Sequence, residues 1–197
     1  MVTHNLKIFK MKKISILLLF ALTLTIVQAQ DTQNSFTVGI DPLVIGVLSG
    51  FEVEAGYNFG KNRVTVEYLV ADVPAVWESQ IDDFESVSAD IFELSYSRFL
   101  NDKQKGFHYG IAYSLFSNYT VTNEAGQSLD KNISKIGIRL GYMWFPFKKA
   151  NFFIEPLFNF GLFLGNEELN FDDGSVFEAG SFAGSGPVIH LGWKFDL

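Results

Sequence analysis

The sequence contains no cysteine, and its 15 basic residues are outnumbered by 22 acidic ones. Without cysteine the fold has no disulfide support. A lipoprotein signal is also excluded, because no thiol is available to carry the lipid. The excess of acidic residues argues against nucleic acid as a partner, since phosphate binding depends on clustered lysine and arginine. Histidine is scarce as well, with three in the chain, which limits the catalytic sites that an imidazole can serve.

The amino-terminal region has the three parts of a secretory signal peptide. A basic stretch at residues 11–13 precedes an almost wholly apolar segment at residues 14–27, and Val27-Gln28-Ala29 is a small-residue cleavage pattern. The apolar segment is shorter than the roughly 20 residues of a transmembrane helix. We predict that translation starts at Met11 and that residues 1–29 are removed. Residues 30–197 then form one domain with 11 basic and 22 acidic residues.

Eight segments of this domain alternate apolar and polar side chains with a period of two, as strands with one apolar face do. They span residues 36–44 (including Pro42 and Val44), 51–59, 64–70, 92–98, 107–115, 136–144, 152–164 and 189–197. Arg98 is the one charged residue on the apolar face. The last segment runs to the carboxyl terminus, so we expect it to close a sheet. No segment with a helical period competes, and we predict an all-β fold.

The opposite face of these strands carries charged and small side chains. Asp41, Arg63, His108 and Asp196 lie on it by the alternation. Charges enclosed in a protein interior must pair with one another. We therefore predict a packed polar network, with the following candidates: Glu52, Glu54, Glu67, Glu93, Lys135, Arg139, Glu155, His190 and Lys194.

The connections between the strands alternate in length. Residues 60–62, 101–105 and 147–150 are short connections, whereas residues 71–89, 118–131 and 165–181 are long ones. The first connection, near residues 48–50, is short where a long one is expected. This alternation predicts a closed up-and-down antiparallel barrel of eight strands, with both termini at the rim of the short turns.

The direction of the apolar face distinguishes a transmembrane barrel from a soluble one, which would turn that face inward around a ligand. Aromatic side chains gather toward the strand ends, where the interfacial girdles of a membrane barrel lie. The girdle candidates are Phe36, Tyr96, Phe107, Trp144, Trp193 and Phe195. Arg98 lies near a short turn, where its charged end can reach the membrane interface. These features favour a transmembrane β-barrel surrounded by lipid.

With these features the chain resembles the small outer-membrane β-barrel family of Gram-negative bacteria, of the OmpA-barrel or OmpX-like, porin-like type. Its composition resembles the barrels of Bacteroidota. The resemblance rests on the signal peptide, the eight strands and the terminal pattern Leu191, Trp193, Phe195 and Leu197. That pattern is similar to the signal read by the outer-membrane assembly machinery, although the family usually ends in phenylalanine.

The resemblance implies a place in the bacterial outer membrane, with both termini in the periplasm. It implies outer-membrane lipid and the outer-membrane assembly machinery as partners. An envelope or extracellular protein is a further partner that we expect for such a barrel. One local rule is broken, because Pro42, Pro156 and Pro187 lie inside proposed strands, where each removes a hydrogen-bond donor. We predict bulges at these prolines, or strand boundaries that differ from those proposed.

The chain offers little for chemistry. It has no Gly-x-Ser-x-Gly or His-x-Glu motif, and His108 and His190 fall within strands. Acidic residues in segments 72–88 and 165–179 lack EF-hand spacing, which favours solvated loops over a metal site. We predict no catalytic residue, cofactor or metal, and a non-enzymatic barrel for envelope structure, adhesion or interaction. The alternatives are a narrow channel or carrier for a small solute and a lipid-modifying enzyme.

Overall fold

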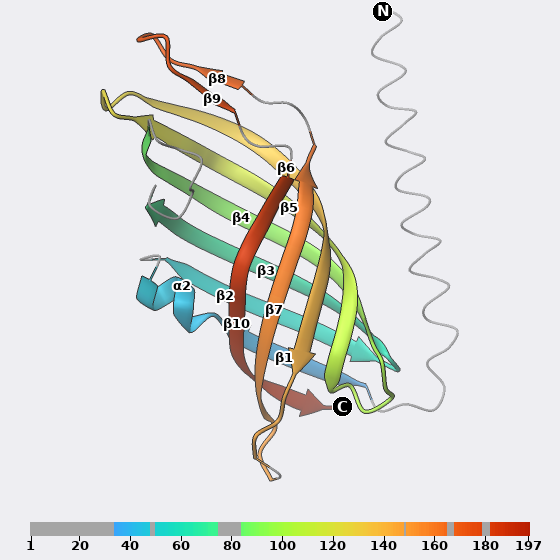
Figure 1. Cartoon of the computed structure of the whole chain (residues 1–197). Coiled ribbons are helices and arrows are strands. Elements are labelled where there is room, and N and C mark those ends of the chain that lie inside the picture. Colours follow the sequence, from blue (N-terminus) through green and yellow to red (C-terminus); the bar gives the residue numbers. More distant parts are fainter. Residues whose placement is uncertain (1–33, 48–49, 75–83, 148, 165–167, 179–181) are drawn as a thin grey trace, which may run out of the picture.

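The computed structural model describes residues 34–47, 50–74, 84–147, 149–164, 168–178 and 182–197. The predicted signal peptide lies outside these residues. Eight antiparallel strands form a closed barrel in the order β1-β10-β7-β6-β5-β4-β3-β2 (Figure 1). The strands are β1 Ser35–Ile40, β2 Phe51–Phe59, β3 Asn62–Pro74, β4 Phe84–Phe99, β5 Gly106–Asn123, β6 Ser128–Met143, β7 Phe152–Phe163 and β10 Phe182–Asp196. The prediction of a closed antiparallel barrel of eight strands is confirmed.

Two further elements lie at the rim opposite the short turns. Helix α2, Pro42–Val47, joins β1 to β2, and the hairpin of β8 (Glu168–Asn170) and β9 (Val176–Glu178) lies between β7 and β10 in the chain. Figure 1 shows both at the same end of the barrel. Among the described residues, no helix is long and apolar enough to cross a membrane.

The terminal strand closes the barrel as predicted. β10 pairs with β1 from Ser35↔Asp196 to Ile40↔Leu191, and β1 pairs on its other side with β2. The carboxyl terminus and the start of β1 therefore lie at the rim that also carries the β2–β3, β4–β5 and β6–β7 turns. Both sides of β1 are paired along its length, so β1 joins the two ends of the strand order and closes the barrel at this rim.

The segment over residues 118–131, expected to be a long loop, is mostly strand. β5 continues to Asn123 and β6 begins at Ser128. The register shifts between Phe116 and Tyr119, where Asn118 has a φ of 52°. This bulge moves the buried positions of β5 from even to odd residue numbers. A search for a strict period of two therefore does not recognise the residues beyond it as part of the same strand. β3 and β4 likewise extend into the predicted loop at residues 71–89.

The three prolines have three different outcomes. The proposed strand over residues 36–44 is wrong beyond Ile40, because Pro42 is the first residue of α2 and Val44 is buried. Asp41 caps this helix, with its Oδ1 accepting a hydrogen bond from the Leu43 amide at 2.7 Å. Pro187 lies in a bulge, because the β10 register shifts between Ser185 and Val188. The predicted bulges are therefore confirmed at Pro187 and replaced by a helix start at Pro42.

Pro156 lies within β7 and interrupts a ladder. The β6–β7 pairing ends at Gly141↔Leu157, and a single bridge, Trp144↔Ile154, continues it in the same register. Ile154 exchanges both of its backbone hydrogen bonds with Trp144, so Pro156, two residues on, directs its nitrogen to the same neighbour. A proline nitrogen has no hydrogen to donate. The ladder is therefore open at this point, without the bulge expected here.

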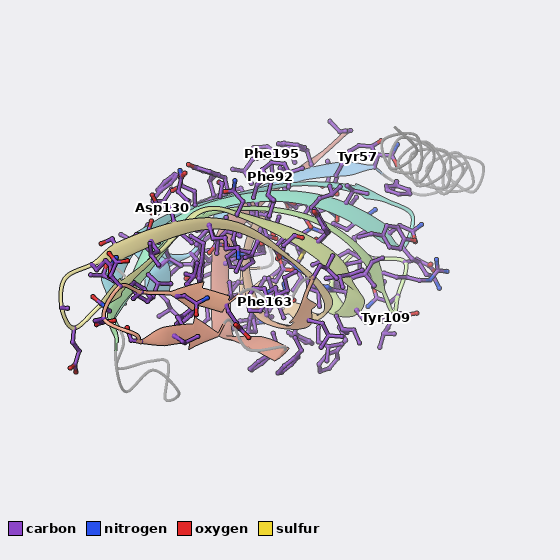
Figure 2. All side chains as sticks on the ribbon, turned by 90° about the horizontal axis from the view of Figure 1, so that it is seen from above. Tyr57, Phe92, Tyr109, Asp130, Phe163 and Phe195 are labelled. Carbon is purple, nitrogen blue, oxygen red and sulfur yellow. The ribbon has the colours of Figure 1, made fainter. Side chains whose placement is uncertain are left out.

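The apolar faces of all eight strands point outward, and the charged faces point inward. Exposed large hydrophobic side chains occur on every strand of the barrel. In Figure 2 the labelled Tyr57, Phe92 and Phe195 lie on the outer side of the ribbon. Arg98 is exposed on the same outer face, and its Nη1 donates a hydrogen bond to Asn62 Oδ1 at 3.0 Å. The soluble alternative, with the apolar face turned inward, does not fit this arrangement.

The aromatic girdle candidates lie on this outer surface. Phe36, Phe107, Trp144, Trp193 and Phe195 are exposed, and Tyr96 is half-buried. The Tyr96 hydroxyl donates a hydrogen bond to Asn62 Oδ1 at 2.7 Å.

Candidate functional site

The barrel interior is built in layers. At the short-turn end lies the rim cluster, made of Phe99, Met143 and Phe153. At the opposite end lies the loop-end cluster: Phe116, Tyr119, Val121, Ile133, Leu169, Phe171 and Phe177. Between them lies the ionic network: Glu52, Glu54, Arg63, Glu67, Glu93, His108, Arg139, Glu155 and His190. Charged side chains therefore occupy the middle of the interior, and apolar ones occupy both ends.

Three glutamates stand side by side on adjacent strands. Glu67 on β3 lies directly opposite Glu54 on β2 and Glu93 on β4. Like charges in such register repel each other unless a cation compensates them. Arg139, which reaches across from β6, supplies that cation. Its Nη2 lies 3.0 Å from Glu54 Oε2, its Nη1 lies 3.0 Å from Glu93 Oε1, and it also contacts Glu67. One guanidinium thus joins four strands through the interior.

Arg63 on β3 makes a second bridge nearer the short-turn end. Its Nη1 donates to both carboxylate oxygens of Glu155 on β7 at 2.7 Å, and its Nη2 donates to Glu54 and, at 3.3 Å, to Thr37 Oγ1. His108 approaches the same carboxylate, with its Nε2 2.8 Å from Glu155 Oε1. These side chains are all buried. Glu54 therefore lies between two arginines and ties their bridges into one network.

His190 on β10 lies between two glutamates of β2. Its Nε2 lies at hydrogen-bond distance, 2.7 Å, from Glu52 Oε1, and its Nδ1 is 3.1 Å from Glu54 Oε2. The second oxygen of Glu52, Oε2, is buried without a hydrogen-bond partner. An unpaired carboxylate oxygen in an interior is costly, because it has lost its water and gained nothing in exchange.

The predicted network residues are placed as follows. Glu52, Glu54, Glu93, Arg139, Glu155 and His190 are buried in the network, and Glu67 is half-buried in it. Lys135 is buried next to the network, with its Nζ 5.8 Å from the centre of the Phe116 ring. Lys194 lies outside it, at the short-turn end, where its Nζ is 3.2 Å from Asp196 Oδ1.

Sequence reasoning left two central residues off the candidate list. Arg63 and His108 lie on the polar face by the alternation, but nothing local marks them as partners of Glu155, which is 92 residues from Arg63 in the chain. Ser114 and Asn159 were also missed, and both donate hydrogen bonds to Glu93 Oε2, at 2.6 and 2.9 Å. A full list of the inward positions would have included all four.

A cavity of about 100 Å³ lies between the ionic network and the loop-end cluster. Its polar wall includes Glu52, Glu67, Glu93, Lys135 and Arg139, and Phe116 contributes to its apolar wall. This volume has room for water molecules beside the charged wall. Two groups of side chains in the network, Glu52–Glu67–His190 and Glu54–Glu155–His190, each bring one oxygen or nitrogen atom per residue within 4.8 Å of the others.

The β8–β9 hairpin covers the loop-end cluster and is fixed by polar contacts. Asp173 Oδ2 accepts a hydrogen bond from Asn123 Nδ2 at 2.8 Å, and Asp172 Oδ2 accepts one from Gln127 Nε2 at 3.0 Å. The Ser175 hydroxyl and amide donate to Asp173 Oδ1 at 2.6 and 2.9 Å. The two hydrogen bonds from Ser175 favour the ionised carboxylate and lower the pKa of Asp173 below its ordinary value.

Comparison with known proteins finds two similar solved structures. No family model and no curated protein matches the chain. The crystal structure of Neisserial surface protein A is 12% identical, with a TM-score of 0.42, and the match covers 84% of this chain and 96% of that one. The N-terminal β-barrel domain of Pseudomonas aeruginosa OprF is 13% identical, with a TM-score of 0.38, covering 85% and 98%. Because both scores lie below 0.5, we base the function on the chain's own residues.

Proposed function

We propose that this protein is a non-enzymatic integral β-barrel of the bacterial outer membrane, with a filled polar interior and a role in envelope structure, adhesion or interaction. The observation that carries the proposal is the distribution of polarity. Ile111 and Ile138, opposite each other on β5 and β6, are 59% and 58% exposed, whereas Arg139, next to Ile138, is 3% exposed. Apolar side chains face the surroundings, and charges face the interior.

Lipid is the surrounding that suits such a surface. A soluble monomer rarely exposes an apolar patch of more than a few hundred Å², whereas here exposed hydrophobic side chains encircle the barrel on all eight strands. A closed barrel also satisfies its backbone within itself, which a lipid environment demands. Crossing the hydrocarbon takes about 9–11 tilted residues, and each strand from β2 to β7, and β10, has at least nine.

Charge supports one orientation across the membrane. The short turns carry Lys61, Lys103, Lys105 and Lys149, whereas the exposed acids Asp130, Asp172 and Asp173 lie at the opposite end. We place the hairpin end outside the cell and the termini in the periplasm, so that the acidic end meets extracellular or envelope partners.

The filled interior favours a structural role over a channel. Arg63 and Arg139 cross the interior to reach carboxylates on facing strands, and the rim and loop-end clusters lie beyond them at either end. The alternative of a narrow channel draws its support from the central cavity. Reconstitution in planar bilayers tests it: we expect no steady conductance, and an open channel of constant conductance would overturn the filled interior.

The membrane location is tested by fractionation together with one substitution. Protein extracted from outer membranes should change its gel mobility after boiling, since a folded barrel migrates differently from its heated form. Ile138→Arg places a charge in the middle of the apolar belt and should lower the free energy of unfolding in lipid vesicles by about 2–4 kcal/mol. Ile138→Leu is the matched control. Protein in the soluble periplasmic fraction, with Ile138→Arg as stable as the control, would contradict the proposal.

A further inference from the structure

We propose that Glu52, Glu67 and His190 form a binding site for one divalent transition-metal ion inside the barrel. One ligand atom from each of these side chains lies within 4.8 Å of the others. The three come from β2, β3 and β10, so the site exists only when the barrel is closed. An imidazole nitrogen with two carboxylate oxygens is a ligand set suited to zinc and to other divalent first-row metals.

The unsatisfied oxygen of Glu52 points to a missing partner. Glu52 is 3% exposed, its Oε1 contacts His190, and its Oε2 has no hydrogen-bond partner. The same residue lines the central cavity together with Glu67. A metal held there gains Glu52 Oε2 as a ligand, and the cavity has room for the water that would complete a four-coordinate site.

The groups behind the three ligands are those that hold metal ligands in place. A metal-bound histidine usually directs its second ring nitrogen to a carboxylate, which fixes its orientation. His190 Nδ1 faces Glu54 Oε2 at 3.1 Å, as a close charge contact without hydrogen-bond geometry, and Nε2 lies on the Glu52 side, where the metal would bind. Glu67 is in turn fixed by its contact with Arg139. Metal binding displaces the hydrogen between His190 Nε2 and Glu52 Oε1, and this proton passes to solvent.

The charge of the interior favours a divalent ion. Among the side chains that the structure describes, the network and the adjoining Lys135 contain five glutamates, two arginines and one lysine. In the metal-bound state His190 has given up its Nε2 proton, and with both histidines neutral these groups carry two net negative charges, which would be costly in an enclosed interior without a counterion. One divalent ion balances them. The second group of ligand atoms, Glu54–Glu155–His190, already has the Arg63 guanidinium on both of its carboxylates.

The experiment is a titration of the intact, detergent-solubilised barrel with zinc chloride in a calorimeter, after removal of metal by chelation. A parallel titration with cobalt chloride reports on coordination through its visible absorption. Glu52→Gln and Glu67→Gln each remove one ligand charge. Glu168→Gln, an exposed acid of β8, is the matched control. The gel shift on boiling establishes that each variant is folded.

We expect the wild-type chain and Glu168→Gln to bind one zinc ion per barrel, with a four-coordinate cobalt spectrum. Glu52→Gln and Glu67→Gln should bind at least tenfold more weakly. No saturable binding to the folded wild type overturns the proposal, and the histidines then serve as the missing cations. Equal binding by all four proteins overturns it too, because exposed acids would account for it. The site depends on interior geometry alone, so a soluble location would overturn the proposed function without touching this inference.

Discussion

Replacing Arg63 with methionine tests whether the ionic network stabilises the barrel. The guanidinium is buried, donates to both oxygens of Glu155 at 2.7 Å, and also contacts Glu54. Methionine has a similar length and fills much of the same space, so the main loss is the charge. Removing one partner of a buried ion pair costs about 3–5 kcal/mol, because the other charge remains without compensation. We expect the free energy of unfolding to fall by that amount.

The measurement is urea unfolding in lipid vesicles, followed by tryptophan fluorescence. Arg98→Met is the matched control, because Arg98 lies on the outer face near the same rim and has a hydrogen bond to Asn62 at 3.0 Å. It should change the stability by less than about 1 kcal/mol. Adding Glu155→Met to Arg63→Met should recover part of the loss, because one uncompensated carboxylate is gone. If Arg63→Met costs no more than Arg98→Met, the network does not stabilise the fold.

Two further predictions concern a close approach of strands and the hairpin. A methyl group at Gly110 would lie 2.7 Å from Ser97 Cα, so Gly110→Ala should lower the free energy of unfolding by about 1–3 kcal/mol. At Gly46 an added methyl group would meet no neighbouring side chain or strand within 4 Å. Gly46→Ala should therefore change the free energy of unfolding by less than about 1 kcal/mol in the same urea assay. The depressed pKa of Asp173 means that its contacts stabilise the hairpin above the unfolded pKa, and that this stabilisation is lost as pH falls through the folded one. Ser175→Ala should raise the Asp173 pKa toward its ordinary value in an NMR titration, and an unchanged titration would refute this cause.

The number of strands and their direction could be predicted because both follow from local information. A period of two sorts side chains between two faces wherever the strand is regular. The prediction failed where one residue breaks the regularity. At Asn118 the bulge exchanges the two faces, and beyond it the continuing strand no longer matches the pattern. At Asp41 and Pro42 the chain carries a cap and a first-turn proline, a helix start that the alternation of the preceding residues conceals.

The sequence predicts which side chains of the ionic network point into the barrel, but not which of them contact one another. The alternation places Arg63, Glu54 and Glu155 on the inward side, since each lies on the polar face of its strand. Which of them meet depends on how far neighbouring strands are staggered around the barrel, and no local pattern records that stagger. For the same reason the row Glu54–Glu67–Glu93 appears only once the register of β2, β3 and β4 is known.

The length of β6 leaves part of the molecule outside the closed wall. β6 pairs with β7 over Lys135–Gly141, so within the described strands its segment Ser128–Ile133 pairs on one side only, with β5. In Figure 1 this part of the β5–β6 ribbon extends well beyond α2. A free strand edge invites other chains to add to it, and charged side chains on the edge oppose this. Asp130 and Lys131 lie within this segment. In a crowded envelope these two charges would protect this edge of the barrel against aggregation.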